Sequence, residues 1–123
     1  MERDAVIVAG FGCSTRADLG SLRAAYAATG AKADALACPE ARRAQLAPLA
    51  EALGVALIAL PDAALRGVAT PTQSARSLAA FGTGSVAEAC ALLAAGPGAV
   101  LRTPRVVARD GLSTCAIAAR KGT

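Results

Sequence analysis

The chain has 123 residues, with 13 Lys or Arg against 9 Asp or Glu, and its formal net charge is +4. Hydrophobic residues make up 54% of it but aromatic residues only 2%, so the core must be built from Ala, Leu, Val and Ile, with closely approaching backbones. The aromatic residues lie in no basic motif, which excludes the stacking platforms of single-strand nucleic-acid binders. Histidine is absent, which excludes a Ser–His or Cys–His relay.

The length of the chain fits one domain, residues 1–123. The first residues lack the pattern of a signal peptide, and no apolar run approaches the roughly 20 residues of a membrane helix. We therefore expect a cytoplasmic protein without membrane or nucleic-acid partners. The cysteines are far apart in the sequence, so we expect free thiols, no metal site and no cofactor; they are Cys13, Cys38, Cys90 and Cys115.

The first predicted elements are a strand and a helix. Residues 5–10 form a continuous apolar run, typical of a parallel strand covered on both faces. A Gly-x-Gly-Cys turn is expected after it. Thr15 and Asp18 have the spacing of a capping pair, and they predict a helix that ends at Gly30.

Two further apolar runs predict strands at 34–38 and 55–60. The segment between them begins with Pro39, which suits the first turn of a helix, and ends at Gly54, a common helix terminator. Pro48 lies inside this predicted helix and should kink it, because proline removes one backbone hydrogen bond.

The second half of the chain predicts helices and a final hairpin. Short helices are expected at 62–65 and near 75–80, and a longer one at 86–95. The runs 99–107 and 113–119 flank the turn signal Ala-Arg-Asp-Gly and predict an antiparallel pair. The predicted fold class is α/β, with three α/β/α layers around a mixed sheet of about five strands.

The stretch "GFGCST" is the first candidate site. It departs from the dinucleotide fingerprint because Thr15 stands where the third glycine belongs. The glycines either allow a tight turn between strand and helix or present amides to an anion at the helix N-terminus. Cys13 is also a candidate nucleophile, although no base accompanies it. The candidate ligand-binding residues are Gly10, Gly12, Cys13, Ser14 and Thr15.

The stretch "GTGSVAEA" is the second candidate site. Ser85 and Glu88 have the spacing of a capping box, in which each side chain bonds the backbone N–H of the other. The glycines before them predict a cradle of amides for an anion, formed by Thr83, Gly84 and Ser85. Glu88 is a candidate general acid or base, but a capping carboxylate would already be committed.

Several of these stretches together resemble a known family. In order and spacing they are similar to the CobE and CbiG C-terminal domain family of cobalamin biosynthesis, over nearly the whole chain. The most specific part is Ser85 to Ala89. The stretches are "GFGC" (10–13), "PTQS" (71–74), "GTGSVAEACALL" (82–93), "TPR" (103–105) and "STCAIA" (113–118).

The resemblance implies a role in building the corrin ring. CbiG-like proteins of the anaerobic branch are larger hydrolases that open a lactone on a cobalt-precorrin, whereas stand-alone proteins of this size are CobE-like. We therefore expect a protein that binds or carries a corrin or precorrin intermediate, with other cobalamin-biosynthesis enzymes as partners. The alternative is a lactone hydrolase in which Cys13 or Glu88 activates water.

Two further expectations come from the resemblance. Arg105 matches a basic position after Pro104 and is expected to contact a ligand carboxylate. Where the family has a Lys followed three residues later by a Glu, this chain has Glu40 and Arg43. The inverted order predicts a structural ion pair.

Overall fold

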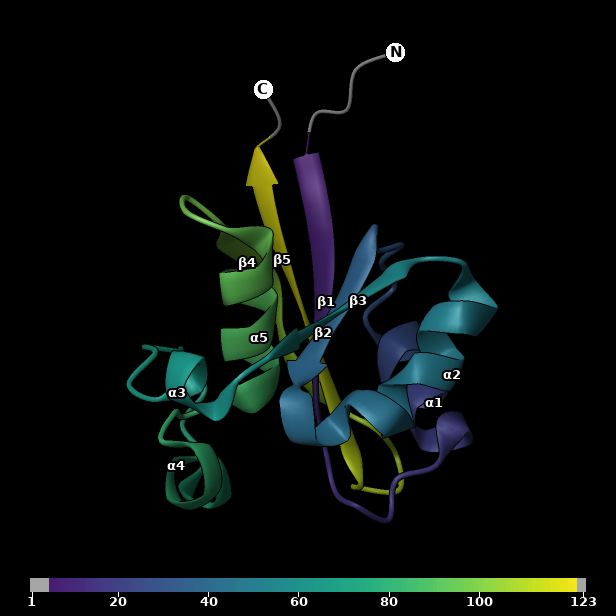
Figure 1. The fold of residues 1–123 in the computed structure, drawn as a ribbon, viewed down its shortest axis with the longest axis horizontal. Helices are drawn as coiled ribbons and strands as arrows, with labels where there is room; N and C mark the ends of the chain where they lie inside the picture. Colours follow the sequence, from purple (N-terminus) through teal and green to yellow (C-terminus); the bar gives the residue numbers. More distant parts are fainter. Residues whose placement is uncertain (1–4, 122–123) are drawn as a thin grey trace.

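A mixed five-stranded sheet forms the centre of the protein, whose structure, a computed structural model, describes residues 5–121 (Figure 1). The strand order is β3-β2-β1-β5-β4. β1, β2 and β3 are parallel, and β5 runs antiparallel to both β1 and β4. This confirms the predicted α/β sheet and its final hairpin. The strands are β1 (Ala5–Cys13), β2 (Ala35–Pro39), β3 (Ala56–Leu60), β4 (Val100–Val107) and β5 (Ser113–Lys121).

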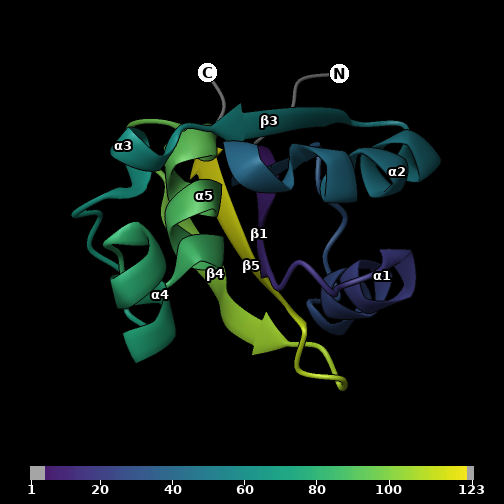
Figure 2. The ribbon, with the colours of Figure 1, turned by 60° about the horizontal axis from the view of Figure 1, so that its bottom comes forward.

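Helices cover both faces of the sheet, as Figures 1 and 2 show. α1 and α2 pack on one face, and α5 packs on the other with α3 and α4 beside it. The three predicted layers are therefore present. The helices are α1 (Leu19–Ala28), the 3-10 helix η1 (Glu40–Arg42), α2 (Arg43–Leu53), α3 (Asp62–Leu65), α4 (Ala75–Phe81) and α5 (Val86–Ala95).

The two faces of the sheet have cores of different kinds. On the α1 and α2 face, large side chains such as Phe11, Leu36 and Ile117 are buried. On the α5 face the buried side chains are mostly alanines, and α5 lies close to β1. A Cβ atom added to Gly10 would lie 2.9 Å from the Cα of Ala91 and closer still to two backbone atoms of the same helix. Gly10 therefore allows the strand and helix backbones to touch.

The Gly-x-Gly-Cys stretch is not a turn, so both interpretations of it as a turn or a helix N-terminus are wrong. β1 continues through Cys13, because Gly10 and Gly12 pair with Ala116 and Thr114 of β5. The pairing partner lies more than 100 residues away in the sequence, and local pattern could not show it.

The predicted start of the first helix is wrong for a local reason. Asp18 is itself the N-cap of α1, and its carboxylate accepts a hydrogen bond from the backbone N–H of Ser21 at 2.9 Å. The capping pair of Thr15 and Asp18 is therefore absent. Pro39 also belongs to a strand, since it pairs with Leu60 in the parallel sheet.

Other local predictions are confirmed. The guanidinium of Arg43 donates to both carboxylate oxygens of Glu40, at 3.1 and 3.2 Å, in an exposed ion pair. Pro48 lies inside helix α2, and Gly54, whose φ of 71° is left-handed, caps its end. The kink expected at Pro48 stays a prediction. All the cysteines are free thiols.

A helix that crosses a membrane must be long and apolar. Among residues 5–121, no single helix is long and apolar enough to cross a membrane. Helices α4 and α5 meet the length and composition test only as a pair bent by 59°.

Candidate ligand-binding site

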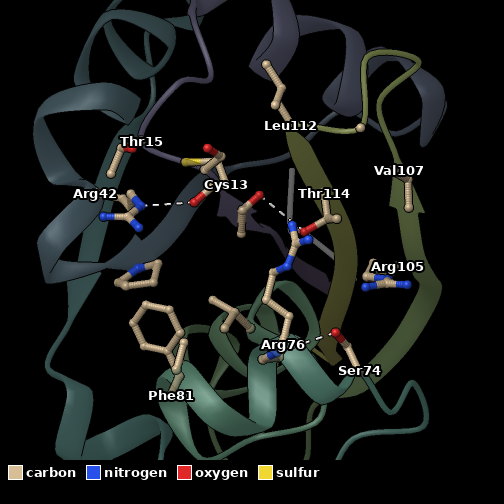
Figure 3. A pocket seen from close by; sticks show the side chains of 17 residues that line it. Cys13, Thr15, Arg42, Ser74, Arg76, Phe81, Arg105, Val107, Leu112 and Thr114 are labelled. Atoms are coloured by element: carbon tan, nitrogen blue, oxygen red, sulfur yellow. Dashed lines mark hydrogen bonds between the residues drawn. The ribbon is translucent and has the colours of Figure 1, made fainter.

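A pocket of about 660 Å³ lies where β1 and β2 end. The loop after β1, helix α4 and the β4–β5 hairpin form its walls (Figure 3). This volume is within the usual range of small-molecule sites, roughly 300–1,000 Å³. In open α/β sheets, ligands bind at the carboxyl ends of the strands, which is the position of this pocket.

The charged residues of the pocket are all basic. Its lining contains Arg42, Arg76 and Arg105 and no acidic side chain. Arg42 comes from η1, Arg76 from α4 and Arg105 from β4, so the folded chain brings together cations from separate elements. Among the described residues, no salt bridge neutralises any of them. The pocket is therefore suited to an anion.

Two of the arginines come from different walls of the pocket. The Nε of Arg42 donates to the carbonyl oxygen of Cys13 at 2.9 Å, which fixes its guanidinium beside the end of β1. In Figure 3, the side chain of Arg76 extends from α4 across the pocket toward Thr114. A ligand in the pocket would meet both guanidinium groups.

The loop after β1 is fixed by its neighbours. The backbone N–H of Ser14 donates to the carbonyl of Leu112 at 2.9 Å, and the side-chain amide of Gln45 donates to the carbonyls of Ser14 and Ala17 at 3.0 Å each. The backbone N–H of Ser14 is therefore already bonded within the protein.

Of the first group of candidate residues, all but Gly10 line the pocket: Gly12, Cys13, Ser14 and Thr15.

The second group of candidates lies outside the pocket. Thr83 is 1% exposed and its hydroxyl donates to the carbonyl of Val68 at 2.8 Å. A Cβ atom on Gly84 would lie 2.6 Å from the carbonyl oxygen of Thr72, so the segment before α4 covers this glycine. Ser85 is 0% exposed. The candidates Thr83, Gly84 and Ser85 therefore do not share the pocket that the first glycine-rich stretch lines.

Glu88 is buried and forms hydrogen bonds with two distant segments. Its Oε1 accepts the backbone N–H of Thr72 at 2.9 Å. Its Oε2 accepts the hydroxyl of Thr72 at 2.7 Å and the backbone N–H of Arg105 at 2.9 Å. The predicted capping box is half present: Ser85 accepts from the N–H of Glu88 at 3.2 Å, but the carboxylate bonds Thr72 and Arg105. Glu88 does not line the pocket.

Comparison with known proteins identifies the family. The family model described as "Cobalamin synthesis G C-terminus" matches residues 7–118. The chain belongs to this family. It is a cobalamin biosynthesis protein, as the resemblance in its sequence implied. Among curated protein sequences, none is significantly similar to it.

Solved structures agree with this assignment. CobE, described as a protein from the cobalamin (vitamin B12) biosynthetic pathway, has a TM-score of 0.81 at 27% identity and covers 100% of this chain and 98% of its own. Cobalamin biosynthesis protein chiG from Agrobacterium tumefaciens str. C58 has a TM-score of 0.69 at 36% identity, with 92% and 97% covered.

A larger protein shares the fold. The chain is similar to a putative cobalamin biosynthesis protein G homolog from Sulfolobus solfataricus, with a TM-score of 0.71 at 21% identity. The match covers 93% of this chain but 36% of that protein. The same fold thus also occurs as part of a longer chain.

Cys13 lies in the pocket without the features of an activated nucleophile. Burial raises the pKa of its thiol, against the opposing charge and hydrogen bond of Arg42. Burial, with Cys13 nearby, also raises the pKa of Cys38 to about 12. The lining residues include no carboxylate that could act as a base. Among residues 5–121, no group of His, Cys, Asp or Glu side chains could hold a metal ion.

We expect Cys13 to react slowly with iodoacetamide at pH 7 in the folded protein. A raised pKa means less thiolate at any given pH, so alkylation should be slower than for an ordinary thiol and accelerate only at alkaline pH, and Cys13 should be labelled before the buried thiols. Mass spectrometry of the labelled protein measures this. Cys13→Ser should fold and lose that first label. Labelling of Cys13 at pH 7 as fast as in urea would contradict a raised pKa, and faster labelling would indicate an activated thiolate.

Sequence reasoning missed Arg42 and Arg76. Arg42 follows the end of β2 by three residues, and the rule that ligands bind at the carboxyl ends of parallel strands provided a signal for it. Arg76 follows the "PTQS" stretch closely, but no local pattern distinguishes it from a solvated helix residue. By contrast Arg105, expected from the resemblance, does line the pocket.

Proposed function

We propose that this domain binds a corrin or precorrin intermediate of cobalamin biosynthesis through the carboxylates of the macrocycle. One observation carries the proposal: arginines from three separate elements line one pocket that contains no acidic side chain. Corrin intermediates have several acetate and propionate carboxylates around the ring. Arginine binds carboxylates with paired, charge-assisted hydrogen bonds, so the pocket and the ring periphery are complementary.

The apolar part of the lining suits the face of a macrocycle. Phe81, Val86, Val107 and Leu112 line the pocket together with the arginines. Ligand sites commonly combine an apolar surface with a few polar groups that orient the ligand. A ring with an apolar face and a charged periphery would use both parts of this pocket.

Binding fits the site better than hydrolysis does. Opening a lactone with water requires a base within hydrogen-bond reach of that water. Glu88 is 0% exposed and its carboxylate already accepts bonds from Thr72 and Arg105, while the thiol of Cys13 has a raised pKa. A carrier would exchange its ligand with the enzymes that make and consume it, so we propose those enzymes as partners in the cytoplasm.

Titration with cobyrinic acid, a corrin with free acetate and propionate side chains, tests this proposal. We expect a saturable change in the visible absorbance of the corrin and weaker binding when NaCl rises from about 0.05 M to about 0.5 M, since salt screens exposed charge pairs. Cobinamide, whose side chains are amides, is the matched control and should bind much more weakly. No saturable change with cobyrinic acid, or equal affinity for the two corrins, would contradict the proposal.

A further inference from the structure

Glu88 connects the two walls that carry Arg105 and Arg76. Its carboxylate bonds the backbone of Arg105 in β4 and both the backbone and the hydroxyl of Thr72. Thr72 lies two residues before Ser74, the N-cap of α4, and α4 carries Arg76. One buried side chain thus contacts both segments that present cations to the pocket.

Arg105 lies in an irregular part of an edge strand. The pairing of β4 with β5 shifts register between Thr103 and Val106, and Arg105 has no Cα partner on β5. Such a bulge breaks the ladder and redirects side chains. The N–H of Arg105 finds its acceptor in Glu88 at 2.9 Å, and a partly buried N–H is costly to leave unpaired. The carboxylate therefore stabilises the bulge from which the Arg105 side chain projects.

The other bonds of Glu88 fix the segment before α4. Helix α4 has no buried residue, so packing of its own side chains holds it only weakly. Its start is held by the bonds of Thr72 to Glu88 and by the bond from the N–H of Ser74 to the carbonyl of Gly84 at 2.8 Å. The position of Arg76 thus depends on hydrogen bonds to the start of α5.

We propose that Glu88 is a positioning residue: its carboxylate sets the separation of Arg105 and Arg76, and hence the spacing of the carboxylates that a ligand must present. This inference rests on the proposed function. Helix capping alone does not require the carboxylate, because Ser85 already supplies the acceptor for the N–H of Glu88.

The variant Glu88→Gln tests this role. Glutamine keeps the size of the side chain but has one acceptor oxygen, so the N–H of Thr72 or of Arg105 must face an amino group. We expect the affinity for cobyrinic acid to fall about tenfold. Asp34→Asn is the matched control, because Asp34 also accepts a backbone N–H, that of Ile7 at 2.8 Å, at the opposite end of β2. This control should bind as the parent does, and an equal loss in both variants would overturn the inference.

A double-mutant cycle separates positioning from general destabilisation. If Glu88 acts through Arg105, then Glu88→Gln should reduce affinity much less in an Arg105→Ala background than in the parent. Independent, additive losses would overturn the inference, because a side chain that merely stabilises the fold does not couple to the guanidinium of Arg105.

Amide hydrogen exchange without ligand distinguishes this inference from the proposed function. In the parent, the amides of Arg105 and Thr72 should exchange slowly, and both should exchange faster in Glu88→Gln. If the parent binds no cobyrinic acid, the proposed function fails, while the exchange rates still decide whether Glu88 holds the two segments. If Glu88→Gln does not fold, rapid exchange of both amides in the parent would overturn the inference, and slow exchange would support it.

Discussion

Gly10→Ala should lower the free energy of unfolding by about 3 kcal/mol or more, although it adds one methyl group. The new Cβ would lie 2.9 Å from the Cα of Ala91 and still closer to the carbonyl oxygen of Ala87. Both contacts are with helix backbone, so no side chain can rotate away. Either β1 or α5 must shift, and α5 is buried along most of its length. Urea denaturation monitored by circular dichroism measures the loss.

Gly20→Ala is the control for the same chemical change. A Cβ at Gly20 would meet only Asp18 Oδ1, at the ordinary distance of 3.4 Å, and Gly20 lies in helix α1. Alanine is the better helix former by up to about 1 kcal/mol, so stability should stay constant or rise. Equal stability of Gly10→Ala and the parent would show that β1 and α5 have room to separate.

Replacing Arg76 and Arg105 together by alanine should weaken binding of cobyrinic acid about 100-fold. A charge-assisted hydrogen bond contributes roughly tenfold or more to an affinity, and two such contacts on separate elements should add approximately. Arg76 is exposed and Arg105 half-buried, so solvent screening keeps each effect at the low end of that range. The absorbance titration with each variant measures the loss.

The control for this pair has the same net charge. Arg23 and Arg102 are exposed arginines outside the pocket lining, and their double alanine variant should bind cobyrinic acid within about threefold of the parent, as expected for screened surface charges. A loss of similar size in both double variants would indicate long-range attraction by net charge, with no direct contact in the pocket.

The sheet could be predicted from sequence because its signals are local. Continuous apolar runs marked the parallel strands, and the Ala-Arg-Asp-Gly turn between two apolar runs marked the hairpin. The boundary errors at Cys13 and Pro39 have one cause: strand pairing with a distant or neighbouring partner extended β1 and β2 beyond the limits set by turn and helix signals.

The pocket could be predicted only in part. Residues 12–15 and Arg105, which the sequence marked as candidates for ligand binding, line it, since they lie at strand ends or in motifs that the resemblance singled out. Arg42 and Arg76 escaped prediction because their convergence depends on where η1 and α4 pack. The same holds for Glu88, whose partners lie 16 and 17 residues away. Its spacing from Ser85 fits a helix cap equally well, so only tertiary structure reveals the difference.

The close contact between β1 and α5 limits the size of the side chains that this helix can carry. In most cores the inward positions require hydrophobic side chains and tolerate the exchange of one hydrophobic residue for another when the total volume is kept. Here the inward side chains of α5 include Ala87, Ala91 and Cys90, all 0% exposed, above a strand glycine. Valine or leucine at these positions would be as hydrophobic as required and still too large for the close contact. The size of a side chain, in addition to its hydrophobicity, is therefore a property that this helix constrains.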